Sequence, residues 1–113
     1  MRRSARNLAH TRDSAPLFSA LGDETRLWLV ARLSDGGPMS IAALTSGSHL
    51  TRQAITKHLR VMDKAGLVHG ARHGRESVWQ LDQRRVQRAR RYLDVISQRW
   101  DVALARLREH LEN

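Results

Sequence analysis

The sequence predicts a mainly α-helical domain that carries one small β-hairpin. Apolar residues recur at helical spacing in several segments, and turns containing glycine or serine separate these segments. One segment, residues 67–81, instead has strand-like composition on both sides of a glycine. The expected order is therefore four helices, two strands and a long final helix. The length of 113 residues fits a single domain.

Composition argues against several classes of protein. The chain has no cysteine, which excludes disulfides, thiolate metal sites and cysteine nucleophiles. No apolar run approaches the ~20 residues of a membrane span, and no apolar segment follows the early arginines as it would in a signal peptide. We therefore expect a cytoplasmic protein with no part in a membrane. No glycine-rich phosphate loop, nucleophile elbow or carboxylate cluster occurs, so we do not expect an enzyme.

The start of the chain predicts an arm followed by the folded domain. Residues 1–14 are basic and polar without a sustained period, and we expect them to form a mobile arm. The domain then covers residues 15–113 and opens with a short apolar patch at 15–21. Asp23 is expected to cap the next helix. In that helix Leu27, Val30, Ala31 and Ser34 repeat at helical spacing.

The middle of the chain predicts two helices and the hairpin. Ser40 is expected to cap a short helix, and after a turn at 46–48 Thr51 is expected to cap a second one. This second helix should end near Gly66, and the hairpin over 67–81 should turn at His73-Gly74. Two helices joined by a short glycine-containing turn are typical of a helix-turn-helix, whose second helix enters the DNA major groove.

The helix that starts at Thr51 separates into two faces. Ile55, Leu59 and Met62 must face the core. The residues left on the other side are hydrogen-bond formers suited to reading DNA, namely Arg52, Gln53, Thr56, Lys57 and Arg60. At the tip of the hairpin, Arg72 and Arg75 are expected to contact the sugar-phosphate backbone or the minor groove. Double-stranded DNA is therefore the expected partner.

The distribution of charge also favours a nucleic-acid partner. The chain has a net charge of +9, and 18 of its 20 basic residues are arginine. The positive charge is concentrated in residues 1–12, 52–75 and 84–91. An acidic protein or an anionic membrane surface would also fit this charge. The arginines of 84–91 either contact phosphate or pair with Asp94 and Glu109 across a dimer, and the sequence does not choose between these roles.

The last 30 residues predict a dimerisation helix over about 83–111. Its apolar residues follow a heptad spacing, and a helix of about 45 Å is too long for a core of this size to cover. We therefore expect a homodimer through the terminal helices, the commonest symmetric assembly. The alternative is that the helix packs only on its own domain. The expected interface residues are Phe18, Leu93, Ile96, Trp100 and Leu107.

Three stretches between Pro16 and Leu81 carry a family signature. They are LTRQAITKHLRVM at 50–62 followed by AGLV, then FSALGDETRL at 18–27 and GRESVWQL at 74–81. Together they resemble the winged helix-turn-helix of ArsR-type (ArsR/SmtB) bacterial repressors, with collinear spacing. The resemblance implies a homodimeric repressor that binds an operator and is often released by a metal or another inducer. Carried over by position, Arg52, Gln53, Thr56 and Lys57 would contact bases and phosphates, and Arg72 and Arg75 would be the contacts of the wing, the hairpin over 67–81.

The chain departs from the metal-sensing members of that family. Those members keep a cysteine pair in the helix before the recognition helix, where this chain has SIAAL at 40–44. The six histidines show no ligand spacing, so we expect no metal and no other cofactor. The pair Trp100-Asp101, with RRYLD at 90–94 before it, resembles a metal-independent subset. The sequence does not identify an inducer.

Two functions fit a chain of this kind. The first is a sequence-specific, dimeric repressor that reads a pseudo-palindromic operator with the second helix in the major groove and the wing on the backbone or in the minor groove. The alternative is a nonspecific architectural DNA- or RNA-binding protein that uses its arginines without reading bases. Only the first requires a strong preference for particular duplexes.

Overall fold

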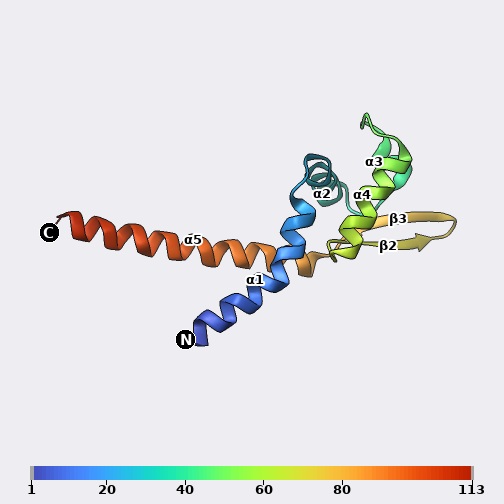
Figure 1. Cartoon of the computed structure of the whole chain (residues 1–113). Coiled ribbons are helices and arrows are strands. Elements are labelled where there is room, and N and C mark those ends of the chain that lie inside the picture. Colours follow the sequence, from blue (N-terminus) through green and yellow to red (C-terminus); the bar gives the residue numbers. More distant parts are fainter. Residues whose placement is uncertain (1, 113) are drawn as a thin grey trace.

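The computed structural model confirms the predicted class, a helical domain with a small antiparallel sheet. It describes the backbone of residues 2–112 and the side chains of residues 11–112. The elements are, in order, α1 (Arg2–Leu21), α2 (Glu24–Gly36), β1 (Met39–Ser40), α3 (Ile41–Thr45), α4 (Arg52–Lys64), β2 (Val68–His73), β3 (Glu76–Leu81) and α5 (Gln83–Glu112). Figure 1 shows α2, α3, α4 and the sheet gathered at one end of the molecule, while α5 projects far beyond them and α1 crosses it.

The predicted helix starts are confirmed by their capping hydrogen bonds. The side chains of Asp23, Ser40 and Thr51 each accept a hydrogen bond, at 3.0–3.1 Å, from the backbone N–H three residues further on. Asp82 accepts hydrogen bonds from the first two arginine N–H groups of α5. These contacts satisfy backbone donors that have no partner inside the helix, so each helix begins where its cap lies.

The first helix is much longer than the sequence predicts. It runs from Arg2 across residue 14, where we expected an arm to give way to a domain, and it contains Pro16. Ser14 and Leu17 are buried where α1 meets α5 and the core. The local sequence has no sustained apolar period, and the described part of α1 packs against α5, a contact distant in sequence that a local pattern does not indicate. The side chains of residues 1–10, where we expected mobility, lie outside the described part of the chain.

The face that α2 buries also differs from the expected one. Leu29 and Leu33 are buried, whereas Leu27, predicted to belong to the repeating face, is 54% exposed. Ala31 and Ser34 are exposed as well. The helix carries apolar residues on every side, so its periodicity does not single out one face. The neighbouring elements decide which side is covered.

The core lies between α1, α2, α3, α4 and the base of the hairpin. The predicted inward residues of α4, Ile55, Leu59 and Met62, are completely buried. They meet buried leucines from three other helices and the first residues of the hairpin, namely Leu17, Leu29, Leu33, Leu44, Leu67 and Val68. This packing fixes the orientation of α4 within the domain.

The sheet contains one strand that the sequence does not predict. The strand order is β1-β3-β2, all antiparallel, and β1 pairs Met39 with Trp79. Two residues are too few to show an alternating pattern, and β1 exists only because it pairs with β3. The predicted hairpin is confirmed, with His73 opposite Glu76 and Gly74 in the left-handed conformation at φ +63°. A second left-handed glycine, Gly66, follows the end of α4, as predicted.

Candidate nucleic-acid interface

The outer face of α4 presents its polar side chains to solvent. Arg52, Gln53, Lys57 and Arg60 are exposed, whereas the three inward apolar residues of the same helix are buried. Thr56 is half-buried, and its hydroxyl donates a hydrogen bond to the carbonyl of Arg52 at 2.8 Å. The hydroxyl oxygen can still accept a hydrogen bond from a ligand. Four of the five predicted residues are therefore exposed, and the fifth, Thr56, is half-buried.

The helix-turn-helix holds α4 at the surface. In α3, Leu44 is fully buried and packs in the core that α4 shares. The turn between the two helices contains Gly47 at φ +83°, and the Ser48 hydroxyl accepts a hydrogen bond from the N–H of Leu50 at 2.9 Å. The turn is therefore fixed by its own hydrogen bonds, and it leads directly into the capped start of α4 at Thr51.

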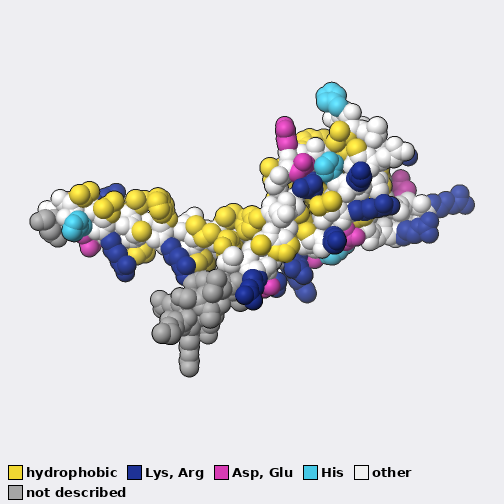
Figure 2. All heavy atoms as spheres, in the orientation of Figure 1, with side chains coloured by type: hydrophobic (Ala, Val, Ile, Leu, Met, Phe, Trp, Pro, Cys, Tyr) yellow, Lys and Arg dark blue, Asp and Glu magenta, His cyan; other side chains and the backbone are white. Residues whose placement is uncertain are grey.

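The hairpin extends the basic surface away from α4. Arg72 and Arg75 are exposed on either side of the turn at Gly74, as predicted. Figure 2 shows lysine and arginine side chains over α4 and at the far end of the hairpin on one visible face of the molecule. A convex helix and a basic projection on one side are the shape and charge that a DNA duplex requires.

A polar network that the sequence did not reveal supports α4 from behind. His58, half-buried on α4, lies with its Nδ1 atom 3.8 Å from the Asp23 carboxylate and 3.4 Å from the Arg26 guanidinium. Arg26 also donates a hydrogen bond to the carbonyl of Ala20. The backbone N–H of Arg26 holds the pKa of Asp23 below its ordinary value, so this carboxylate stays charged. The network ties the middle of α4 to the start of α2, and His58 is packed between elements.

A second histidine joins three elements of the site. His69 on β2 lies 2.7 Å from the Asp82 carboxylate through Nε2 and 3.6 Å from the Asp63 carboxylate through Nδ1. The hydrogen bond from His69 is the main reason that the pKa of Asp82 is lowered. The end of α4, the wing and the start of α5 therefore meet at one imidazole. The sequence does not reveal this cluster, because Asp63 and Asp82 become neighbours of His69 only in the fold.

The arginines at the start of α5 have varied surroundings. Arg85 lies over Gly66 at the end of α4, so close that a Cβ on that glycine would lie 3.2 Å from its Nε atom. Arg88 lies 3.9 Å from the Asp13 carboxylate on α1. Neither of the two acidic partners considered from the sequence, Asp94 and Glu109, forms an ion pair with a described residue of the single chain.

The apolar residues of α5 divide into a covered and an uncovered part. Ala89 is buried in the core, so the first turns of the helix pack on their own domain. The later apolar residues at heptad spacing, which we call the seam, are exposed, namely Leu93 (51%), Ile96 (47%), Trp100 (65%) and Leu107 (54%). Figure 2 shows this hydrophobic band along the projecting helix. Phe18, the fifth expected interface residue, is half-buried, with its ring centroid 5.7 Å from that of Tyr92.

Two searches of the described residues gave negative results. None of the helices in the described part of the chain is both long enough and apolar enough to cross a membrane. Among the side chains of residues 11–112, no three His, Asp or Glu residues are grouped so that they could hold a metal ion.

The fold and this surface define a class of protein, the DNA-binding transcription regulators with a winged helix-turn-helix. Comparison with known proteins agrees. A family model described as a helix-turn-helix domain matches residues 21–71. An uncharacterized HTH-type transcriptional regulator of Bacillus subtilis, YuzN, is 40% identical over an alignment of 68 positions, which covers 55% of this chain and 74% of the relative.

Solved structures give the same result over more of the chain. An ArsR-like transcriptional regulator from Rhodococcus sp. RHA1 superposes with a TM-score of 0.74 at 32% identity, covering 87% of this chain and 92% of the other. A structure described as a possible transcriptional regulator for arsenical resistance matches with a TM-score of 0.62 at 31% identity, covering 69% and 80%. The chain belongs to the ArsR-like family of helix-turn-helix transcriptional regulators, a class without enzymatic activity.

Proposed function

We propose that this chain is a dimeric, sequence-specific repressor that reads a pseudo-palindromic operator. The observation that carries the proposal is the division of α4, in which three inward side chains are completely buried while Arg52, Gln53, Lys57 and Arg60 are exposed. A helix anchored in this way inserts as a rigid unit, and the DNA major groove, about 12 Å wide, accommodates an α-helix. The repressor role rests on the resemblance to ArsR-type repressors.

The side chains on the outer face of α4 have distinct roles in this proposal. Arg52 and Lys57 donate hydrogen bonds to guanine, and Gln53 pairs with adenine through its amide. Thr56 and Arg60 contact a base edge or a phosphate. The start of α4 is fixed by the Thr51 cap. The first turn therefore holds Arg52 and Gln53 at a defined position relative to the base edges in the groove.

The hairpin supplies the second contact with each half-site. Arg72 and Arg75 reach the sugar-phosphate backbone or the minor groove next to the recognition helix. Arginine suits both sites, because its planar guanidinium forms paired hydrogen bonds with phosphate oxygens and a narrow minor groove attracts positive charge. Backbone contacts of this kind fix the register of the protein without reading sequence.

A second copy of the chain covers the exposed band on α5. Leu93, Ile96, Trp100 and Leu107 lie at heptad spacing, and each is about half exposed or more in the single chain. Phe18 adds to this interface from α1. A two-fold dimer built on this seam places two recognition helices about 34 Å apart, which is one turn of DNA, so each reads one half of a pseudo-palindrome.

Selection of bound sequences from random duplexes by the purified protein tests the proposal. We expect a pseudo-palindromic consensus, and we expect the selected duplex to be preferred over random duplex by about 10³ or more at fixed salt concentration. Equal affinity for selected and random duplex would instead favour a nonspecific architectural DNA- or RNA-binding protein.

We further propose that the chain belongs to a metal-independent subset of its family. This rests on the absence of cysteine and on the histidine spacing of the sequence. Titration of zinc into the complex with the selected duplex should leave its affinity unchanged. A tenfold or larger loss of affinity would show that the protein senses metal. The sequence leaves any other inducer unidentified.

A further inference from the structure

The wing projects from the domain, and it is buried only at its base (Figure 1). Val68 is buried, while residues 69–77 are half-buried or exposed. The strand β2 lies at an edge of the sheet and pairs only with β3. Its six residues span about 20 Å, so a rotation of about 10° at the base would displace the tip by about 3.5 Å. A contact near the base therefore controls where Arg72 and Arg75 lie.

One side chain connects the wing to the neighbouring elements through polar contacts. Among the described residues, His69 is the only residue of β2 or β3 whose side chain forms a hydrogen bond or an ion pair. Its Nε2 atom lies 2.7 Å from Oδ2 of Asp82, and its Nδ1 atom lies 3.6 Å from Oδ1 of Asp63 at the end of α4. The hydrogen bond from His69 lowers the pKa of Asp82, so this carboxylate is charged and can only accept hydrogen bonds. The Nε2–H group of His69 is therefore the donor.

The two carboxylate oxygens of Asp82 bind different elements. Oδ1 accepts hydrogen bonds from the backbone N–H groups of Arg84 and Arg85, at 3.0 and 3.2 Å, and so caps α5. Oδ2 accepts the hydrogen bond from His69. The backbone N–H of Asp82 also donates to the carbonyl of Leu67 at 2.8 Å, which closes the open end of the wing. The acceptor of His69 is therefore attached to the first turn of α5.

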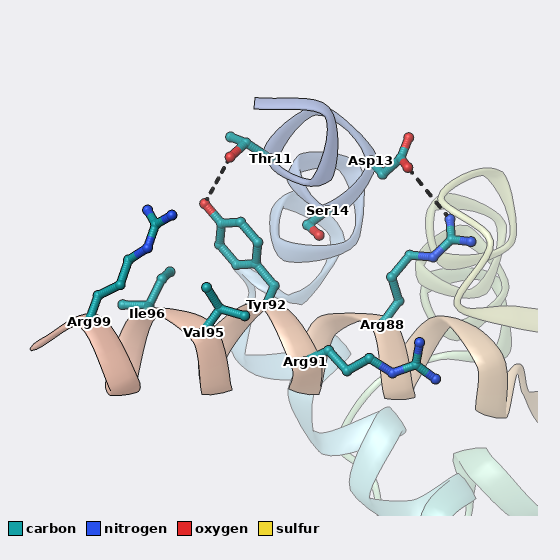
Figure 3. Close-up of a pocket in the computed structure, with 9 residues that line it drawn as sticks. All are labelled: Thr11, Asp13, Ser14, Arg88, Arg91, Tyr92, Val95, Ile96 and Arg99. Carbon is teal, nitrogen blue, oxygen red and sulfur yellow. Dashed lines mark hydrogen bonds and ion pairs between the residues drawn. The ribbon is translucent and has the colours of Figure 1, made fainter. Parts of the chain in front are cut away.

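The first turns of α5 are in turn held against α1. Figure 3 shows α1 crossing α5 beside a cavity of about 450 Å³. The hydroxyl groups of Thr11 and Tyr92 form a hydrogen bond of 3.2 Å across this contact. Arg88 lies 3.9 Å from the Asp13 carboxylate. The helix α5 therefore gives Asp82 a fixed position, and His69 holds the wing to that position.

We propose that His69 is a positioning residue that fixes the direction of the wing relative to α4 and α5. Its two ring nitrogens face the end of α4 and the start of α5, so one imidazole limits rotation of the wing relative to both helices. Without this contact the apolar base alone holds the wing, and the tip samples a wider range of positions. The consequence for DNA rests on the proposed function. Arg72 and Arg75 then meet the half-site that α4 reads without the cost of first ordering the wing.

Pulsed electron paramagnetic resonance tests the direction of the wing without DNA. The chain has no cysteine, so Val61→Cys on α4 and Ser77→Cys on β3, both at exposed positions, can carry one spin label each. Dilution with an excess of unlabelled chain leaves only the distances within one chain. We expect His69→Ala to broaden the distance distribution about twofold or more. An unchanged distribution would mean that the apolar base fixes the wing, and would overturn the proposal.

Two further variants separate the hydrogen bond from other effects of the substitution. Gln80→Ala is the matched control, because Gln80 is exposed and lies directly opposite His69 in the sheet, and it should leave the distribution unchanged. His69→Gln has an amide N–H that can donate to Asp82 in place of Nε2–H, and it should keep the distribution narrow. Circular dichroism checks that each variant is folded. Equal broadening in His69→Gln and His69→Ala, or in Gln80→Ala and His69→Ala, would overturn the role of the hydrogen bond.

Affinity for the selected duplex tests the consequence for DNA. Joint replacement by Arg72→Ala and Arg75→Ala should weaken binding about fivefold or more in the wild type, but about twofold or less in His69→Ala. Arg52→Ala on α4 should cost the same in both backgrounds. Equal losses from the wing arginines in both backgrounds would overturn the positioning role. If the wild type showed no preference for the selected duplex, the proposed function would fail, whereas the spin-label distances would still decide the role of His69.

Discussion

Two exposed side chains at the start of α4 account for most of the base preference that we propose. Arg52 and Gln53 occupy the first turn, directly after the Thr51 cap, and neither contributes to the core. Their hydrogen-bonding groups are therefore available to a ligand without any cost to the fold. Arginine matches the acceptors of guanine and glutamine matches adenine, so the two side chains predict different base preferences.

Replacement of either side chain should relax base preference at one position of the operator. We expect Arg52→Ala or Gln53→Ala to cost about 1–3 kcal/mol of binding free energy at that position. The measurement is fluorescence anisotropy with a set of duplexes that differ by single base pairs. Arg108→Ala, near the far end of α5, is the control and should leave the preference intact. Unchanged base preference in both test variants would remove α4 from the groove.

The hydrogen bond between His69 and Asp82 makes the contribution of Asp82 to folding stability depend on pH. Because its folded pKa is lowered, Asp82 binds a proton less readily in the folded chain than in the unfolded chain. The resulting stabilisation is complete above its ordinary pKa of 3.8 and is lost as the pH falls through the lower folded value.

The variant Asp82→Asn tests this contribution, because asparagine keeps the helix cap but not the charge. We expect the wild type to be more stable than the variant above about pH 4, and this advantage should shrink as the pH is lowered toward 2. Urea unfolding at several pH values between 2 and 5 measures it. A difference in unfolding free energy that stays constant over this range would show that the carboxylate is not stabilised by folding.

The proposed recognition helix, α4, is held in place by its buried face and not by the face proposed to contact DNA. Ile55, Leu59 and Met62 fill the core, and the helix is further held at both ends by the Thr51 cap and the left-handed Gly66. Burial of such side chains supplies much of the free energy that keeps α4 in place, because a helix of 13 residues is only marginally stable alone.

Truncation of the central anchor should therefore destabilise the whole domain. Leu59→Ala should lower the free energy of unfolding by about 2–5 kcal/mol, the usual cost of removing a fully buried leucine side chain. The matched control is Leu27→Ala on α2, which removes the same atoms from a side chain that is 54% exposed and should cost about 0.5 kcal/mol or less. Urea denaturation at one protein concentration compares them. Similar costs for the two variants would contradict the core described above.

The shape of the whole molecule is governed by α5. The chain extends over 66 × 29 × 20 Å, because this helix continues far beyond the head formed by the other elements (Figure 1). Its second half carries exposed apolar side chains that no described residue of the same chain covers. Large exposed apolar patches on a small protein typically mark an interface.

A charge in the middle of the seam should separate the two copies. Trp100→Asp should yield monomers in sedimentation velocity, while the helical content measured by circular dichroism stays the same because Trp100 is 65% exposed in the single chain. Gln98→Asp is the control, since its side chain lies about 200° around the helix from Trp100. Dimers that persist in Trp100→Asp would refute the seam.

The assembled dimer should bind DNA with a strong dependence on salt. Two copies double the number of basic side chains that reach phosphate, and with about 6–10 phosphate contacts the affinity should fall about 10³–10⁵-fold between 50 and 200 mM salt. Anisotropy titrations over this range give the slope. A slope close to zero would mean that the basic surface does not contact the phosphate backbone.

Much of the fold and of the site follows from local sequence. The caps at Asp23, Ser40 and Thr51, the glycine after α4 and the hairpin turn are short-range signals, in which a side chain and its partner lie within a few residues. The two faces of α4 follow in the same way, because its apolar residues repeat with the helical period. This is why every residue proposed to contact DNA could be named from the sequence, and why each proved to lie on an accessible surface.

The tertiary structure decided the features that depend on partners distant in sequence. It selected Leu29 over Leu27 as the buried residue of α2, it paired β1 with β3, and it placed His69 between two aspartates. It also continued α1 across residue 14 and opened a cavity between α1 and α5. None of these features produces a periodic pattern in the sequence, since each arises from contacts between segments that only folding brings together. The chain alone determined where α2, α3 and α4 begin and which face of α4 is polar, because those depend on interactions between near neighbours.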